Sequence, residues 1–171
     1  MTSKLAIAAA ALLLAGPAAA AAGPSDPQIA HIAYTAGALD VEAAKLALKK
    51  SHNRAVREFA AEMVRDHEAV NDKALALVKK LGVTPEPNAT SEGLTKQAAA
   101  TRAKLAKLNG KAFDRAYAAN EAAYHATVNG ALKSTLIPSA DNGELKALLE
   151  TGLTLFGDHQ KHAEHLAANL K

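Results

Sequence analysis

Hydrophobic residues recur along most of this chain at intervals of three and four residues, which is the spacing of one face of an α-helix. The pattern predicts four long helices, over residues 28–50, 54–81, 111–136 and 144–170, and a shorter helix between residues 91 and 108. No stretch shows the period-two alternation that is typical of a half-buried β-strand. The sequence therefore predicts an all-α protein.

Short segments that contain Gly, Pro, Ser or Asn separate the predicted helices, and these residues end one helix or cap the next. In chain order they are residues 51–53, 82–90, 109–110 and 137–143. Long helices joined by such connections are typical of bundles. We therefore predict a single domain over residues 23–171. Its expected fold is an antiparallel, up-down-up-down four-helix bundle, with the short helix inserted between the second and third long helices.

The first 22 residues have the pattern of a secretory signal peptide. An early cation, Lys4, precedes an apolar run over residues 5–15, and small residues then offer cleavage sites near Ala20 or Ala22. We expect residues 1–22 to be removed on export, with the mature protein in the periplasm. The alternative is that they stay as an N-terminal anchor. No other segment is apolar enough to suggest a stable membrane span.

Composition narrows the function without naming it. The 171 residues include no cysteine, which excludes disulfides and thiolate chemistry, and the net charge of +3 comes from Lys and Arg scattered among acidic residues. That distribution lacks the basic patch of a nucleic-acid-binding protein, so we expect no nucleic-acid partner. There is no Gly-rich phosphate loop and no nucleophile elbow. The sequence specifies no reaction, and a non-enzymatic role is favoured.

One histidine interrupts the apolar face of the second long helix. At 3.6 residues per turn, His67 lies about 40° from Met63, the centre of that face, and Asp66 lies about 60° to the other side. A lone histidine in such a position is usually a hydrogen-bonded core residue. The interpretation changes if other helices place titratable groups at the same depth.

Three other helices do place such groups on their apolar faces. They are Asp40 on the first helix, Glu121 and His125 on the third long helix, and His159 on the last. Their distances from the intervening turns predict that Asp40, His67, His125 and His159 reach one level, with Glu121 a turn away. Imidazoles with one or two carboxylates suit zinc, iron, copper or manganese. We predict these four residues as metal ligands, and Asp66, Glu121 and His162 as alternative or supporting ligands.

Three alternatives remain open from the residues alone. A buried Asp/Glu–His network could satisfy these groups without a metal, which would leave a non-catalytic structural or stress-related module. His159, His162 and His165 form i,i+3 pairs that could instead chelate an ion at the surface. A di-iron or peroxide-handling redox enzyme is the third alternative. The metal's identity, its presence and the oligomeric state are not specified by the sequence.

Three segments carry a family resemblance: "AGALDVEAAKLALKKSHNRAVREFAAEMVRDHEAVNDKALALVKKLGV", "FDRAYAANEAAYHATV" and "HQKHAEHL". They resemble domain of unknown function family 4142 (DUF4142), over about residues 28–168. The resemblance implies an exported bacterial protein with a ferritin-like bundle and no assigned activity. His67, His125 and His159 coincide with the family's marked histidines, and Asp40 falls on its acidic position in the first helix.

The sequence departs from the di-iron pattern found in many ferritin-like proteins. That pattern requires a Glu-x-x-His motif on each of two helices and a Glu from each of the others. Here Glu121 is followed by a histidine four residues later, and the last helix offers His159 and His162 with no inward Glu. A ferroxidase or di-iron oxygenase is therefore disfavoured, and a single-metal site rich in histidine is easier to build.

Overall fold

The computed structural model describes residues 23–170, and within them it contains helices and no strand. The predicted signal peptide lies outside the described residues. The elements are α1 (Asp26–Lys50), α2 (Arg54–Leu81), α3 (Ala89–Ala106), α4 (Gly110–Ala131), the π-helical turn η1 (Leu132–Leu136), α5 (Ile137–Ser139) and α6 (Gly143–Asn169). The prediction of an all-α chain is confirmed.

Local sequence signals set most of the helix ends. The side chain of Asn53 accepts the N–H of Val56 at the start of α2, and α2 ends where Gly82 adopts a left-handed conformation with φ of 65°. Asn88 caps α3, because its Oδ1 accepts the backbone N–H groups of Thr90 and Ser91. The predicted helix over residues 111–136 is interrupted, since its last five residues form the π-helical turn η1.

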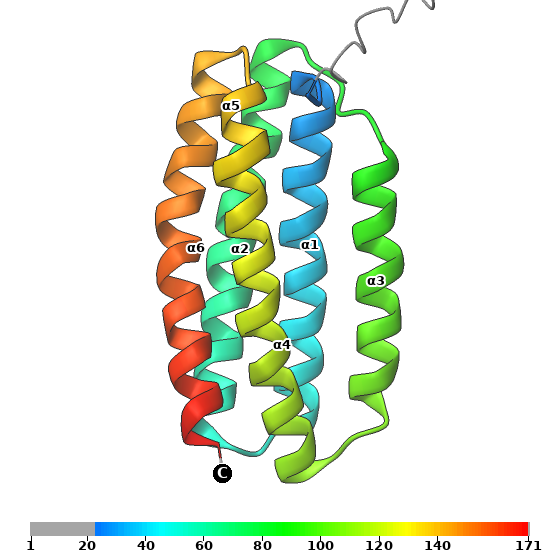
Figure 1. Ribbon diagram of the computed structural model, residues 1–171, viewed down its shortest axis with the longest axis vertical. Helices are drawn as coiled ribbons and strands as arrows, with labels where there is room; N and C mark the ends of the chain where they lie inside the picture. The colour runs from blue at the N-terminus through cyan, green and yellow to red at the C-terminus, as the bar shows by residue number, and fades with distance from the viewer. Residues whose placement is uncertain (1–22, 171) are drawn as a thin grey trace, which may run out of the picture.

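Helices α1, α2, α4 and α6 lie side by side along the long axis of the molecule, and α3 lies outside them against α1 (Figure 1). Figure 1 also shows that α3, together with the loops at its two ends, returns the chain from one end of the bundle to the other before α4 begins. As a consequence α2 and α4 point the same way. The four bundle helices therefore run down, up, up and down, which corrects the expected up-down-up-down order.

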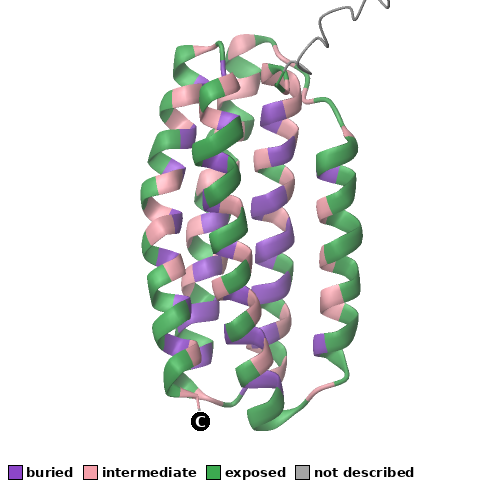
Figure 2. Ribbon diagram, viewed as in Figure 1, coloured by how far each residue is buried: buried purple, intermediate pink, exposed green. Residues whose placement is uncertain are grey.

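The buried residues lie mainly on the four bundle helices, whereas α3 is mostly exposed (Figure 2). They form two hydrophobic clusters. One cluster, which we call the dense half, lies toward the α1–α2 turn and centres on Phe59, Met63 and Tyr117. The other, which we call the hollow half, lies toward the α5–α6 turn and includes Ile32, Leu149 and Phe156.

No helix within residues 23–170 is long and apolar enough to cross a membrane.

Candidate metal centre

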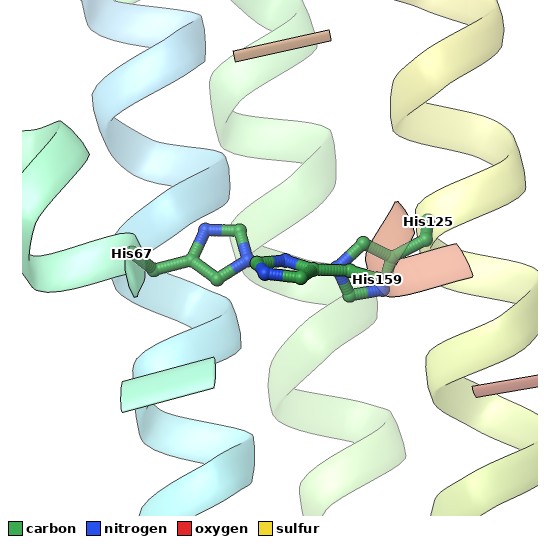
Figure 3. Close-up of side chains that lie close together, drawn as sticks. All are labelled: His67, His125 and His159. Atoms are coloured by element: carbon green, nitrogen blue, oxygen red, sulfur yellow. The ribbon is translucent and has the colours of Figure 1, made fainter. Parts of the chain in front are cut away.

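Three histidines from three helices meet between the two hydrophobic clusters. His67 of α2, His125 of α4 and His159 of α6 enter the bundle at the same level (Figure 3). Their ring centroids are 5.4 to 5.7 Å apart, and one nitrogen of each ring lies within 4.8 Å of the others. All three side chains are buried. The structure thus brings together the three histidines that the sequence placed at one depth.

Asp40 of α1 contacts two of these histidines from the fourth helix, and it also groups with Glu121 and His125 as a possible ligand set. Its Oδ2 lies 2.8 Å from Nε2 of His67 and 3.4 Å from Nε2 of His125. The carboxylate is 2% exposed, so water does not screen these contacts. We call Asp40, His67, His125 and His159 the inner centre.

The hydrogen bond of His125 to the backbone fixes which of its nitrogens is free. Nδ1 of His125 lies 3.0 Å from the carbonyl oxygen of Glu121, and a carbonyl can only accept. Nδ1 therefore carries the hydrogen, and Nε2 of the neutral ring has a lone pair. That lone pair is on the nitrogen that lies 3.4 Å from Asp40 Oδ2, which is also an acceptor.

His159 has the same arrangement with a different partner. Its Nε2 lies 3.1 Å from Oδ2 of Asp66, so Nε2 is the donor and Nδ1 of the neutral ring has the lone pair. Nδ1 is buried and has no hydrogen-bond partner in the structure. A ligating histidine typically donates its other ring N–H to a carboxylate or a carbonyl in this manner.

An unusual number of buried polar atoms around the inner centre lack a hydrogen bond. These atoms are Asp40 Oδ1 and Oδ2, both ring nitrogens of His67, Glu121 Oε2, His125 Nε2 and His159 Nδ1. Asp40 and His67 lie close together, but the angles of their contact are not those of a hydrogen bond. Because buried polar groups are nearly always paired, so many unpaired polar atoms at one place indicate a missing partner.

Two carboxyl groups of the centre differ in their protonation. Burial raises the pKa of Asp40, but the close contact with His67 and the positive charge that this ring can carry outweigh the effect of burial and lower the pKa to about 2. Burial, together with the nearby charge of Asp40, holds the pKa of Glu121 well above its usual value. Asp40 is therefore the anion of the pair, and Glu121 is the protonated acid.

The two histidines with fixed tautomers are held neutral. Burial lowers the pKa of His125 and outweighs the attraction of Asp40 for its charged form. Burial also lowers the pKa of His159, although its contact with Asp66 acts in the opposite direction. Neutral imidazoles and an ionised carboxylate are the forms that bind a metal ion.

A second, outer group of side chains continues from His159 toward the surface. Asp66 accepts two hydrogen bonds from Arg65, which lower its pKa, and it also contacts His159. One turn away, Nδ1 of His162 lies 2.8 Å from Oε2 of Glu62. Glu62, Asp66 and His159 could hold an ion together. Asp66 and His162 therefore lie beside the inner centre rather than in it, whereas Glu121 is buried against Asp40.

Two features of the site were not predicted from the sequence. Phe156 stacks on the His67 ring, with centroids 4.6 Å apart and planes 11° apart. A Cβ at Gly152 would come within 3.2 Å of the Phe156 ring, so the glycine leaves room for this stacking. The pairing of Glu62 with His162 was also not predicted. The signal that could have indicated it is the spacing of Glu62 and Asp66, because residues four apart lie on the same face of a helix.

A cleft connects the centre to the outside between α1, α3 and α4. It has a volume of about 120 Å³ and reaches Asp40 and Glu121. Gln97, Thr101 and Arg102 of α3 line its outer part.

Comparison with known proteins identifies the family and not the activity. A search of curated proteins found no match. Among solved structures, the chain is similar to CopM in the Cu(II)-bound form, with a TM-score of 0.66 over 87% of this chain and 99% of that chain. The sequence identity is 13%, so this likeness shows a shared fold alone. Residues 12–166 match the family described as "Domain of unknown function (DUF4142)", as the sequence predicted, and the chain belongs to this family.

Proposed function

We propose that this protein binds one transition-metal ion at the inner centre, through Asp40, His67, His125 and His159. The observation that carries the proposal is the contact between His125 Nε2 and Asp40 Oδ2. Two acceptor atoms lie 3.4 Å apart in a buried site, and the backbone hydrogen bond of His125 keeps a proton on its other nitrogen. Such a pair requires a cation between or beside its members.

A second proton on His125 would also supply a positive charge, but it is disfavoured. Burial lowers the pKa of this ring, so the imidazolium form is the less stable one at neutral pH. A metal ion avoids this cost because it binds the neutral ring through the free lone pair. It would also give a partner to the other unpaired atoms of the centre.

The donor atoms favour a borderline metal. Three imidazole nitrogens and one carboxylate suit zinc, copper, iron or manganese, whereas sites for Cu(I) are rich in Cys and Met. The chain has no cysteine and only two methionines. The similar structure of CopM was determined in a Cu(II)-bound form, which makes Cu(II) the first ion to examine.

The proposal assigns no reaction to the protein. We place the chain with the ferritin-like bundles, because α3 and its loops form one long crossover connection of the kind those folds have. The Glu-x-x-His motifs of the di-iron members are absent from the sequence. The function supported best is therefore metal binding by a non-enzymatic protein. We propose that residues 1–22 direct its export and that it acts in the periplasm.

Titration of the metal-free protein with Cu(II), followed by electron paramagnetic resonance, tests the assignment of ligands. We expect a spectrum with nitrogen hyperfine coupling from imidazoles that saturates at one ion per chain. His125→Ala should remove this spectrum. His165→Ala is the matched control, because His165 is exposed on α6 and lies outside the inner centre. An unchanged spectrum in His125→Ala would contradict the proposal.

A metal-free polar network is the second candidate function. It is favoured by the distance of 2.8 Å between His67 Nε2 and Asp40 Oδ2, which suits an ion pair. In that case the protein would be a structural or stress-related module. Its melting temperature would be the same with and without a strong chelator and would change with pH as the histidines titrate.

A further inference from the structure

A partly enclosed apolar cavity lies in the hollow half of the bundle, next to the inner centre. Its volume is about 190 Å³. His67, His125 and Phe156 line one end, and Leu136 and Leu145 are among the residues that line it farther from the centre. The cavity is separate from the polar cleft at Asp40, although Leu94, Tyr124 and Thr127 belong to the walls of both.

The cavity exists because small residues occupy positions where larger ones would fill the core. Alanines and glycines from four helices line it: Ala30, Ala33, Ala36, Gly37, Ala74, Ala131 and Gly152. Leu132 and Leu136 of the π-helical turn η1 form another part of the wall. Single π-helical turns inside helices occur frequently at functional sites.

We propose that this cavity binds a small, uncharged, apolar molecule of about the size of benzene or toluene. An engineered cavity of about 150 Å³ lined by Leu, Ile and Phe in another protein stays dry and binds benzene or xenon. The cavity here is larger and similarly lined, with the two imidazole edges at one end as its main polar feature. A charged or strongly polar ligand would lose its hydration there without gaining partners.

The position of the cavity relates this ligand to the proposed metal. A molecule in the cavity would contact His67 and His125, so it would lie against two of the proposed metal ligands. Binding itself does not rest on the metal, because protein side chains form the whole wall. The two proposals can therefore fail separately.

Toluene is a suitable probe, and the test uses the full mature chain without metal. We expect toluene to raise the melting temperature and to shift the amide resonances of residues around Ala36 and Gly152. Ala74→Leu fills the cavity and should abolish both effects. Ala76→Leu makes the same change at an exposed position of α2 and should leave both effects intact. If Ala74→Leu does not fold, Ala36→Val provides a second, smaller filling of the same cavity.

The outcomes separate the two proposals. Equal toluene effects in Ala74→Leu and Ala76→Leu, or no effect in the unaltered protein, would overturn the cavity proposal. The same titrations after loading with Cu(II) report on the centre. Toluene binding in a protein that takes up no Cu(II) would support the cavity and contradict only the metal.

Discussion

The two halves of the bundle interior differ in how completely they are filled. In the dense half, Phe59, Met63 and Tyr117 are fully buried and their aromatic rings pack edge to face. In the hollow half, a cavity of about 190 Å³ remains among aliphatic side chains. The inner centre lies at the boundary, where Phe156 contacts His67 from the hollow side. The ligands are thus held firmly from one side and adjoin open space on the other.

This difference has an energetic consequence. Cavities in protein cores cost about 24 cal/mol per Å³, so an empty volume of this size corresponds to about 4 to 5 kcal/mol of lost stability. A natural sequence could recover much of that loss with a few larger side chains. This contrast fits our proposal that the hollow half takes up a ligand, whereas the dense half provides stability.

Truncation in the dense half should have the largest effect. Phe59→Ala removes a fully buried ring that contacts Tyr117, and we expect the free energy of unfolding to fall by about 3 to 5 kcal/mol. Chemical denaturation of the metal-free protein measures this change. Tyr34→Ala is the control, since Tyr34 is largely exposed and its loss should matter little. Similar losses for both variants would show that the dense half is not the stabilising core.

Enlargement should have opposite effects in the two halves. Ala60→Leu adds bulk to a position of α2 that is fully buried in the dense half, and overpacking should cost about 1 to 3 kcal/mol. Ala74→Leu lies on the same helix but fills the cavity, so it should add about 0.5 to 2 kcal/mol. Denaturation curves of the two variants provide the comparison. A loss of stability in both would mean that the cavity cannot accept a larger side chain.

The sequence was sufficient to predict the helices and the depth of the inner centre. Hydrophobic spacing located the long helices, and the turn at residues 51–53 placed Asp40 and His67 at one level, as their contact confirms. It did not predict the direction of the third long helix, because the length and packing of α3 decide whether the chain crosses the bundle. Nor could it predict the cavity, since alanines suit a helix equally well beside a neighbour and beside empty space.

Replacement of Glu121 by Gln should have a smaller effect on stability, and this effect should depend on pH. The pKa of Glu121 is raised well above its usual value in the folded protein, so as the pH rises the unfolded chain gives up this proton before the folded chain does. The stability that Glu121 contributes is present below pH 4.5 and is lost as the pH rises toward its raised pKa. Glu121→Gln should therefore stabilise the metal-free protein at pH 7 and change it little near pH 4. Thermal denaturation at both pH values measures this difference, and equal effects at both would contradict the assignment.

The histidines should produce the smallest effect, best observed in the Glu121→Gln background. Burial lowers the pKa values of His125 and His159, so the unfolded chain takes up protons first as the pH falls below about 6.5. The stability that these two histidines contribute is present above that pH. It is lost as the pH falls toward the pKa values that the two rings have in the folded protein. We expect the melting temperature of the metal-free protein to decrease between pH 7 and pH 5. A constant melting temperature over this range would show that the two rings are not held neutral.

Metal content of the mature protein, purified without a tag or chelator, tests the central claim most directly. Mass spectrometry should find close to one transition-metal ion per chain in the unaltered protein and in His165→Ala, and should name the ion. It should find none in a His67→Ala/His159→Ala double variant that remains folded. Equal trace amounts of metal in all three proteins would contradict the metal centre and would leave a buried Asp–His network in its place.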